Sequence, residues 1–338
     1  MRGIVCEEIG SFRLRDDLPE PEAGLGEAIV RIRRVGICGT DLHAYQGNQP
    51  FFEYPRILGH ELAGVIERIG ENGEGLRAGD PVSVIPYLHC GSCVACRNGK
   101  TNCCTRMKVL GVHADGGMRE RIAVPATHLV KTEGLTWDQA AMLEPLAIGA
   151  HAVRRAGLLP GEDVLVIGAG PIGLGVMAFA KAAGARVIAM DINDERLAFC
   201  RSWAGADETV HALREGQDRL AELTGGELPT AAFDATGNVR SMEGAFERVA
   251  HGGRLVFVGL VKADLTFRDP EFHKRELTLM GSRNATREDF RHVIETVRSG
   301  LIDIGRYVTH RSDLAHMIAD FESWLEPETG VIKAILEL

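Results

Sequence analysis

The segment between Asp163 and Asp191 constrains the fold more than any other part of the chain. An apolar run, Val164 to Ile167, has the length and residue types of a buried strand. A G-x-G-x-x-G pattern follows it directly, with Gly168, Gly170 and Gly173. A segment rich in Ala, Leu and Met then predicts a helix that ends at Gly184, and a second apolar run, Val187 to Met190, stops at Asp191. This order predicts one βαβ unit of a parallel sheet.

The glycine pattern, in this context, predicts a dinucleotide site. The first glycine permits a tight turn, the second lets the backbone approach a pyrophosphate, and the third lets helix and strand pack closely. The pyrophosphate would meet free N–H groups at the helix N-terminus. The Asp191 carboxylate can accept from a ribose 2′-OH and would repel a 2′-phosphate, which favours NAD over NADP; the nearby Arg196 keeps this preference from being absolute. The residues predicted to contact the cofactor at the turn are Gly168, Gly170, Pro171, Ile172 and Gly173.

Strands and helices alternate through residues 147–286, which predicts a doubly wound parallel sheet. We expect further strands at 209–210, 231–234, 254–258 and 277–280. We expect helices at 195–204, 214–223 and 239–250. The loops after two of these strands should border the cofactor, through Thr236, Gly259 and Leu260.

The flanking segments have a β-rich pattern. Alternating apolar and Arg residues at 29–32 predict a half-buried strand, and further strands are expected at 62–69 and 81–86, on either side of a turn at 70–75. After the alternating region, Thr286 precedes a helix expected at 287–298, and an alternating run at 331–336 predicts a strand that returns to the first domain. The predicted domains are therefore 1–146 and 147–286, with 287–338 completing the first.

Five of the eight cysteines lie between residues 90 and 104. In the spacing Cys90-x2-Cys93-x2-Cys96-x7-Cys104, four thiolates can close a tetrahedral shell, which is typical of a structural zinc site. Cys103 is a surplus thiol that could compete with Cys104 as the fourth ligand.

A second set of potential ligands is spread along the first domain: Cys38, His60 and Glu144. Each could be structural when considered alone, as a buried thiol, a core histidine or an acid at a helix start. Together they offer a thiolate, an imidazole and a carboxylate. Three such ligands with a free fourth position make a catalytic zinc site.

Composition excludes several classes of protein. With 338 residues, 45% of them apolar, the chain is long enough to build two domains. Its net charge is -9, and its basic residues are scattered along the sequence rather than gathered into the kind of stripe that binds nucleic acids. The N-terminus shows no signal peptide, and the apolar stretch at 174–183 is interrupted by Lys181. We therefore expect a cytoplasmic protein with a small-molecule substrate and neither a nucleic-acid nor a membrane partner.

The whole chain resembles zinc-containing medium-chain dehydrogenases of the sorbitol and threonine dehydrogenase type. The motifs that carry the resemblance are GICGTDLH (36–43), LGHELAGVI (58–66), the four-cysteine lobe (90–104), EPLAIGAHAV (144–153) and VIGAGPIG (166–173). The resemblance implies a GroES-like β-barrel catalytic domain beside a Rossmann NAD-binding domain. It also implies two zinc ions per subunit and a homotetramer or homodimer formed through the Rossmann sheet.

The resemblance also assigns roles to single residues. The catalytic zinc ligands would be Cys38, His60 and Glu144, and the sequence leaves open whether Glu61 replaces Glu144. Asp41 would hydrogen-bond His60 and fix its tautomer. Thr40 would accept the proton of the substrate hydroxyl and pass it through the cofactor ribose to His43.

Three further segments, 47–61, 109–117 and 269–286, resemble bacterial sugar-acid dehydrogenases that act on L-galactonate or L-gulonate at C5. A sugar acid needs a cation for its carboxylate, and Arg283 is the first candidate, with His113, Lys274 and Asn284 behind it. Phe51, Phe52 and Tyr54 would line the pocket. The alternative substrates are a polyol, butanediol or L-threonine, and the alternative from another class is a non-catalytic NAD-binding protein.

Overall fold

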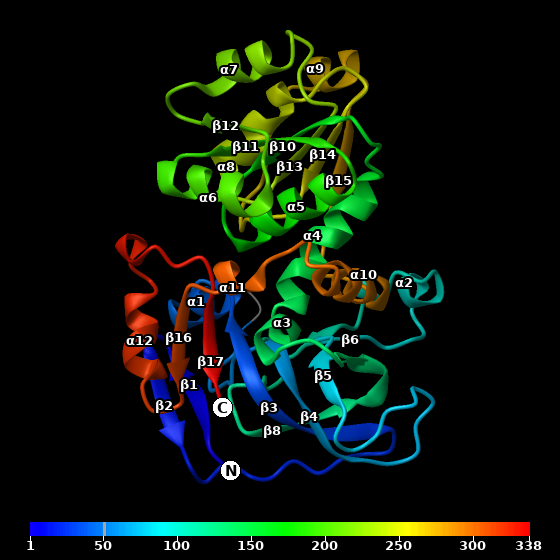
Figure 1. Ribbon diagram of the computed structural model, residues 1–338, viewed down its shortest axis with the longest axis vertical. Coiled ribbons are helices and arrows are strands. Elements are labelled where there is room, and N and C mark those ends of the chain that lie inside the picture. The colour runs from blue at the N-terminus through cyan, green and yellow to red at the C-terminus, as the bar shows by residue number, and fades with distance from the viewer. Residues whose placement is uncertain (50–51) are drawn as a thin grey trace. The chain divides into compact units, whose positions relative to one another are not determined.

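The computed structural model describes residues 1–49 and 52–338, and the chain divides into two compact units. Unit 1 comprises Met1–Glu144 and Thr286–Leu338, and unit 2 comprises Pro145–Ala285. Unit 1 is thus built from two separate stretches of chain, whereas unit 2 is continuous. Figure 1 shows the elements of each unit in the colours of the sequence.

Unit 2 is built on a six-stranded parallel sheet in the order β12-β11-β10-β13-β14-β15. Numbered within the unit, this is the order 3-2-1-4-5-6 of dinucleotide-binding sheets, so the predicted doubly wound sheet is confirmed. Apart from Asp163 at the start of β10 and Asp234 at the end of β13, the residues of the two central strands are apolar and buried, as expected for strands covered on both faces. The strand bounds are β10 Asp163–Ile167, β11 Arg186–Asp191, β12 Glu208–His211, β13 Ala231–Asp234, β14 Arg254–Phe257 and β15 Thr278–Gly281.

The helices expected in unit 2 are present, but one of them is shorter than predicted, and α9 was not predicted. The segment expected as a helix at 239–250 is an α-helix only to Gly244 and continues as a 3-10 turn, η3 Ala245–Arg248. The prediction was wrong there because the chain must turn toward the sheet: the Ala250 N–H donates to the Pro229 carbonyl, and Ala245 and Phe246 are buried in the core beneath. The helix bounds are α5 Pro171–Ala182, α6 Asp194–Ala204, α7 Gly216–Leu223, α8 Val239–Gly244 and α9 Asp269–Lys274.

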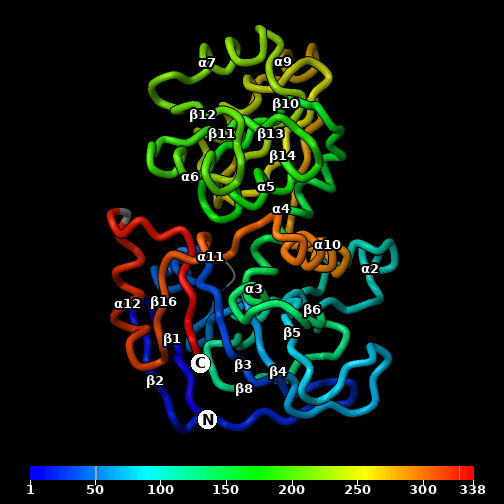
Figure 2. Tube along the Cα trace, in the orientation of Figure 1, coloured from blue at the N-terminus to red at the C-terminus, as the bar shows by residue number. Residues whose placement is uncertain are grey.

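Unit 1 centres on the long strand β3 (Glu27–Ile37), which pairs with three partners. Its first half pairs with β8 (Arg121–Pro125), its second half pairs with β17 (Ala334–Glu337), and β4 (Glu61–Ile69) pairs along most of its length. The tube in Figure 2 shows the red C-terminal strand β17 beside the blue β3. The C-terminal strand therefore returns to the first unit as predicted, although it begins at Ala334 rather than at residue 331.

The remaining strands of unit 1 extend this sheet or form two small hairpins, β1–β2 and β6–β7. The strand expected at 81–86 ends at Val84, because the Ile85 N–H turns to the His128 carbonyl and Pro86 has no N–H to donate. The bounds are β1 Gly3–Glu8, β2 Ser11–Arg15, β5 Pro81–Val84, β6 Tyr87–Leu88, β7 Lys108–Val109, β9 Leu129–Lys131 and β16 His310–Asp313.

Short helices connect these strands. Helix α10 has the predicted bounds, and its start is fixed by a capping box in which the Thr286 N–H and hydroxyl both bond Asp289 Oδ2 at 2.8 Å. The α-helices are α1 Gly39–Tyr45, α2 Val94–Arg97, α3 Trp137–Ala141, α10 Arg287–Arg298, α11 Ile304–Tyr307 and α12 Met317–Ser323, and α4 Leu143–Ala156 continues from unit 1 into unit 2. The 3-10 turns are η1 Thr101–Cys103, η2 Ala126–His128 and η4 Pro327–Thr329.

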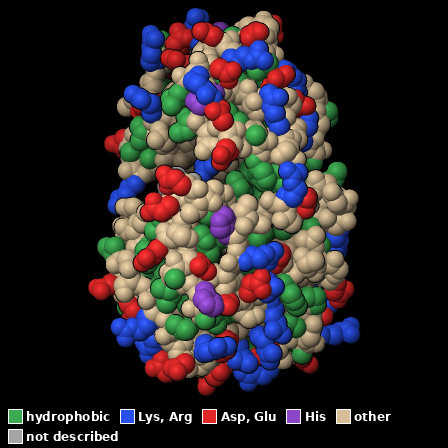
Figure 3. Space-filling view, turned by 60° about the vertical axis from the view of Figure 1, so that its left-hand side comes forward, with side chains coloured by type: hydrophobic (Ala, Val, Ile, Leu, Met, Phe, Trp, Pro, Cys, Tyr) green, Lys and Arg blue, Asp and Glu red, His purple; other side chains and the backbone are tan. Residues whose placement is uncertain are grey.

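The surface shows two features that bear on function. On the face shown in Figure 3, acidic and basic side chains are interspersed. None of the helices in the described ranges is both long and apolar enough to cross a membrane.

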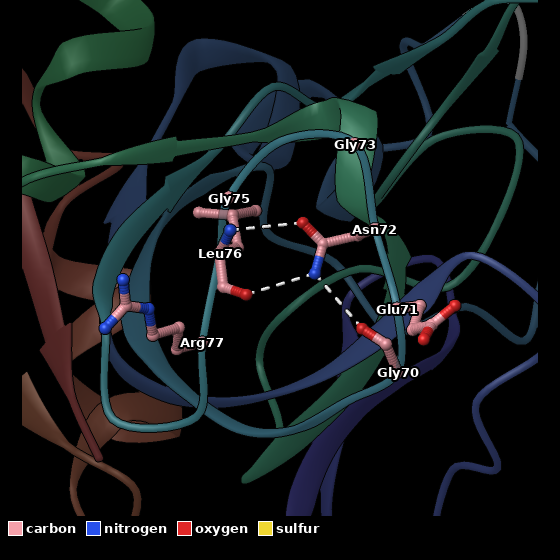
Figure 4. Close-up of a pocket in the computed structure, with 7 residues that line it drawn as sticks. All are labelled: Gly70, Glu71, Asn72, Gly73, Gly75, Leu76 and Arg77. Atoms are coloured by element: carbon pink, nitrogen blue, oxygen red, sulfur yellow. Dashed lines mark hydrogen bonds between the residues drawn. The ribbon is translucent and has the colours of Figure 1, made fainter.

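A hollow lies within the turn Gly70–Arg77, where the Asn72 side chain bonds the Gly70 carbonyl and both backbone groups of Leu76 (Figure 4). Asn72 thus closes the predicted turn from inside, and the hollow is a product of that turn.

Candidate metal and cofactor sites

Three potential metal ligands converge at the ends of two neighbouring strands of unit 1. Cys38 follows β3, while His60 and Glu61 stand at the start of β4, and the register of the two strands pairs Gly36 with Glu61. One ligand atom each of Cys38, His60 and Glu61 lies within 4.8 Å of the others. Residues 22 positions apart in sequence therefore meet because β3 and β4 are antiparallel.

Glu61 of this group and Glu144 beside it are each held through one carboxylate oxygen. Lys333 Nζ donates to Glu61 Oε1, and the Tyr87 hydroxyl donates to Glu144 Oε1. Glu144, in the first turn of α4, is buried but stands outside the 4.8 Å group as far as the described residues show. The structure thus brings Glu61, one of the two carboxylates that the sequence left open, together with Cys38 and His60.

The charges of this cluster perturb one another strongly. Burial alone would lower the pKa of His60, but the charges of Asp41, Cys38 and Glu144 outweigh burial and raise that pKa well above its usual value. Burial raises the pKa of Glu144 to about 7, with the charge of Glu61 adding to the effect. Several acidic groups are therefore crowded in a buried site with few cations to offset them.

A zinc ion fits these residues. Three buried polar atoms of the cluster, His60 Nδ1, Glu61 Oε2 and Glu144 Oε2, have no hydrogen-bond partner in the described structure. Buried polar atoms are costly to leave unpaired, so the cluster needs a partner that accepts thiolate, imidazole and carboxylate together. That donor set is the one that zinc takes in catalytic sites.

Asp41 does not make the hydrogen bond that was expected of it. The distance from Asp41 Oδ1 to His60 Nδ1 is 3.8 Å, too long for a hydrogen bond. The Asp41 oxygens instead accept from the backbone N–H groups of Cys38, at 2.8 Å, and Gly59, at 3.2 Å. Asp41 therefore fixes the backbone on both sides of the ligand set and acts on His60 through its charge.

Helix α1 carries the two residues expected to move a proton. Thr40 is half-buried in its first turn, and His43 is exposed one turn later. Residues three apart share one face of a helix. The two side chains therefore lead from the ligand end of the helix to solvent.

The four-cysteine lobe has the geometry of a closed metal site. One sulfur each of Cys90, Cys93, Cys96 and Cys104 lies within 4.8 Å of the others. Backbone N–H groups of Cys90 and Arg106 donate to the Cys104 sulfur at 3.3 Å, and that of Cys93 donates to the Cys90 sulfur at 3.4 Å. Such donors stabilise thiolates: hydrogen bonds from the Ser92 backbone, the Arg106 side chain and the Cys93 backbone lower the pKa of Cys90 to about 5. The neighbouring Cys103 is exposed and stands outside this group of four.

The glycine turn of unit 2 places each glycine in a different local environment. Gly168 has a φ of +99°, and a Cβ on Gly173 would lie 1.8 Å from the Gly168 oxygen. A Cβ on Gly170, by contrast, would meet nothing within 4 Å among the described atoms. Pro171 begins α5, and Ile172 follows it in the first turn. The turn thus combines a left-handed residue, a close helix–strand contact and an open position before a helix N-terminus, which is the arrangement that admits a pyrophosphate.

Asp191 ends β11 and is bound to this turn. Its Oδ2 accepts from the Ala169 N–H at 2.6 Å, and its Oδ1 accepts from the N–H groups of Ile192 and Asn193. Arg196 lies exposed on α6. The position of the carboxylate is therefore fixed by backbone groups.

The two loops expected to border the cofactor lie side by side. Thr236 donates through its N–H and hydroxyl to the buried Asp234, and a Cβ on Gly259 would lie 2.4 Å from the Gly237 nitrogen. Leu260 is largely exposed. Parallel strands β13 and β14 bring these loops to the same edge of the sheet as the glycine turn.

The residues predicted to contact the substrate come from both units of the chain. Phe51 lies outside the described residues. Phe52 packs edge-on against Tyr54 at 4.7 Å over the core of unit 1, and His113 is exposed with its Nδ1 accepting from the Val109 N–H. In unit 2, Arg283 and Lys274 are exposed, and Asn284 adopts a φ of +51°.

Sequence reasoning missed three residues of the metal cluster: Tyr87, Lys333 and Gly36. Lys333 is 2% exposed, and Gly36 leaves space for Glu61, since a Cβ there would lie 2.0 Å from Glu61 Oε2. One signal was available: a lone lysine within the apolar run VIKAIL (331–336) must be buried if that run is a core strand, and a buried ammonium needs an acid.

Comparison with known proteins identifies the family to which the chain belongs. A family model described as an alcohol dehydrogenase GroES-like domain matches residues 24–134, and one described as a zinc-binding dehydrogenase matches residues 171–299. The chain is 45% identical to L-galactonate-5-dehydrogenase of Escherichia coli K12, over 99% of this chain and 98% of that protein. It is 33% identical to 2-dehydro-3-deoxy-L-galactonate 5-dehydrogenase of Pseudoalteromonas atlantica, over 94% of this chain and 92% of that protein.

A solved structure agrees over the whole chain. A protein described as a short chain alcohol dehydrogenase, RspB, of Escherichia coli CFT073, complexed with NADH, matches with a TM-score of 0.93 at 32% identity, covering 100% of this chain and 99% of that one. The expected GroES-like domain, nucleotide-binding sheet, NAD cofactor and zinc dependence are thereby confirmed. Because relatives at this identity span nearly the entire chain, the protein belongs to the zinc-type medium-chain alcohol dehydrogenases and is an oxidoreductase that acts on CH–OH groups with NAD.

Proposed function

We propose that this protein oxidises a secondary alcohol of a hexonate such as L-galactonate or L-gulonate and transfers the hydride to NAD. The observation that carries the chemistry is the convergence of Cys38, His60 and Glu61, together with three buried polar atoms that lack a partner in the described structure. The substrate class rests on the relatives named for L-galactonate and its dehydrated derivative.

In this proposal the two units have different binding roles. Unit 1 holds zinc and the reacting end of the substrate, and its lobe of four cysteines holds a second, structural zinc. Unit 2 binds NAD through its glycine turn, through Asp191 and through the loops at Thr236 and Gly259. The Asp191 carboxylate favours NAD, because a 2′-phosphate would bring a second negative charge to a fixed one.

Cys38, His60 and one of the carboxylates Glu61 and Glu144 would hold the catalytic zinc. When bound, this ion supplies a Lewis acid that favours the deprotonated form of an alcohol. His60, Glu61 and Glu144 are buried and Cys38 is partly buried, which limits the access of bulk water to that position.

The chain's own residues handle the proton. In the reaction the C–H bond of the alcohol carbon breaks, its electron pair leaves as hydride to C4 of the nicotinamide, and the hydroxyl proton is released as the C=O bond forms. Thr40 would accept this proton at its hydroxyl, and His43 would deliver it to solvent. The exposure of His43 supports this path, because the last carrier must exchange with solvent.

A cation should bind the carboxylate of the hexonate, and Arg283 is the first candidate, ahead of His113 and Lys274; the neutral amide of Asn284 could only donate a hydrogen bond to it. Arg283 follows the last strand of the parallel sheet, on the edge where ligands of such sheets bind. An arginine fork can bind a carboxylate through two parallel hydrogen bonds. Phe52 and Tyr54 would line the apolar side of the pocket.

We further propose a homo-oligomer, dimer or tetramer, formed through the exposed edge strand β15, and a cytoplasmic location. The eight cysteines are all free thiols, which suits a reducing compartment.

The proposal is tested by following NADH absorbance across L-galactonate, L-gulonate, sorbitol, 2,3-butanediol and L-threonine, with zinc content measured alongside. We expect the two hexonates to have the highest kcat/KM and Arg283→Ala to raise the KM of hexonates by about tenfold more than that of sorbitol. Cys38→Ser should lose one zinc per chain and all turnover while NADH binding persists. Turnover in that variant would refute the metal assignment, and an equal KM change for both substrate classes would refute the role of Arg283.

A further inference from the structure

Helix α10, the turn at 70–77 and strand β9 enclose a groove on the surface of unit 1. Its volume is about 300 Å³, which is at the lower end of the range for small-molecule sites. All of its lining residues belong to unit 1. None of them belongs to the zinc cluster, to the four-cysteine lobe or to the glycine turn. The function proposed above therefore does not use this groove.

The wall that α10 contributes to the groove is cationic. Arg287, Arg291 and Arg298 follow one another at intervals of four and seven residues, which places them on one face of the helix. The buried side chains of Ile294 and Leu129 line the groove beside them. Apolar walls of low dielectric strengthen the electric field of the charges that they border.

Two of the four cations that line the groove are matched by acids. Arg287 Nη1 lies 3.3 Å from Glu74 Oε2, and Lys131 Nζ lies 2.8 Å from Asp80 Oδ2. Arg287 also donates through Nη2 to the Thr127 carbonyl. A guanidinium has five N–H donors, so Arg287 keeps donors for a further acceptor.

The other two cations, Arg291 and Arg298, form no ion pair within residues 1–49 and 52–338. Arg298 donates to the Glu133 carbonyl at 2.6 Å, and this neutral acceptor leaves its charge unpaired. Arg291 is exposed and makes no hydrogen bond to any residue that the structure describes. Glu295 also lines the groove but forms no ion pair with either arginine in the described part of the chain. Because the whole chain carries a net charge of -9, this local surplus of cations does not reflect a generally basic surface.

The charges of Arg287 and Arg291, one helical turn apart, act on each other. Burial lowers the pKa of Arg287; the charge of Glu74 opposes this effect, and the charge of Arg291 adds to it. Like charges this close are destabilising on a helix. An anion between the two guanidinium groups would remove the repulsion.

We propose that this groove binds an oxyanion, the phosphate or carboxylate group of a small metabolite, between Arg287 and Arg291. Both guanidinium groups would donate charge-assisted hydrogen bonds to it. Arg298, about 10 Å further along the helix axis, adds positive charge at the other end of the groove. Because Arg287 is also bound to Thr127 and Glu74, the anion would join α10 to the turn at 70–77 and to the chain before β9.

The test titrates the zinc-loaded, NADH-saturated protein with inorganic phosphate and, separately, with succinate, in an isothermal calorimeter at low ionic strength. Saturation with NADH keeps the pyrophosphate position of the glycine turn occupied. We expect saturable binding of at least one of the two anions. Tighter binding of phosphate would identify a phosphate ester as the ligand, and tighter binding of succinate would identify a carboxylate. The titration reads binding and not turnover, so its outcome does not depend on the hexonate activity.

Two variants in the groove should change this affinity in opposite directions. Arg291→Met should weaken binding by about tenfold, the scale of losing one hydrogen bond to a charged group. Glu295→Gln removes an acid that would repel the anion and should tighten binding by about threefold, the scale of one exposed charge pair. Both side chains are exposed on α10, and far-ultraviolet circular dichroism checks that both variants fold.

Arg268→Met is the matched control, because it removes an exposed arginine of unit 2 that does not line the groove. It should leave the affinity for both anions unchanged. If neither anion binds the starting protein, or if binding is as tight in Arg291→Met as in the starting protein, the proposal is wrong. An equal loss of affinity in Arg268→Met would also overturn it, since net charge alone would then explain the effect.

Discussion

One buried residue outside the zinc cluster makes folding depend on pH. His128 is 5% exposed, its Nε2 lies 3.0 Å from Nδ1 of His89, and its Nδ1 lies 3.2 Å from the Thr127 hydroxyl. Burial lowers the pKa of His128 to about 4, and the nearby His89 and Arg287 add to the effect. The fold therefore accepts this imidazole only in its neutral form.

The sign of the resulting pH dependence follows from the pKa of the two states. An unfolded histidine titrates near pH 6.5. Between about pH 6.5 and 4 the unfolded chain therefore binds a proton that folded His128 does not, and stability falls as the pH falls, by up to about 3 kcal/mol. Replacing His128 by Gln should flatten this decline. The thermal midpoints of both proteins, measured at about pH 7.5 and about pH 5 with equal zinc content, test this, and an equal loss in both would contradict it.

At the scale of single residues, the sequence predicted the residues whose chemistry depends on their spacing along the chain. Cys38, His60 and the four lobe cysteines stand out because few other functions need such residues so placed. Gly36 and Tyr87 did not stand out, because a missing side chain and a lone hydroxyl gain meaning only from the strand or helix placed opposite. The expected bond from Asp41 to His60 failed for a similar reason: backbone N–H groups close by in space had already taken its oxygens.

At the scale of elements, the four-cysteine lobe is the part of unit 1 that depends most on metal. Its helix α2 has four residues, none of them buried, and η1 has three, so apolar burial cannot hold it. We predict that Cys93→Ser loses one zinc per chain and that amides of residues 90–108 exchange hydrogen much faster. Hydrogen exchange read by mass spectrometry, with zinc content in parallel, checks this. Cys103→Ser is the matched control, since that exposed thiol lies outside the group of four. Unchanged protection in the Cys93→Ser protein would show that the lobe folds without its metal.

At the scale of elements, helices whose ends are marked by capping residues in the local sequence were predictable. The local sequence of helix α10 contains a capping box at its start and Gly300, with a φ of +77°, just after its end. The bounds of this helix match the prediction. The helix expected at 239–250 was too long because burial of Phe246 and a backbone bond to Pro229 shorten it, and neither is local. Tertiary contacts likewise set the start of β17, since the Thr309 hydroxyl takes the Ile332 N–H just before it.

At the scale of the whole molecule, the discontinuous unit 1 has a consequence for the active site. Strand β17 brings Lys333 to Glu61 across 272 residues of sequence, and it pairs with the end of β3 that precedes Cys38. The continuous unit 2 is inserted between the two parts. The C-terminal segment is thus needed both to complete a sheet and to complete the zinc cluster, and no local pattern could have predicted the second role.

The last strand of unit 2 predicts how copies of the chain associate. Within the described structure β15 pairs only with β14, three of its four residues are exposed, and Leu279 is 40% exposed. An open strand edge with an apolar side chain can pair with the same edge of a second copy across a twofold axis. Leu279→Glu should therefore lower the mass measured by light scattering after size exclusion, because like charges would meet at the axis. Leu159→Glu changes a more exposed leucine in a loop of the same unit and should leave the mass unchanged. NADH binding should persist in both variants, and an unaltered mass for Leu279→Glu would place the contact between copies elsewhere on the surface.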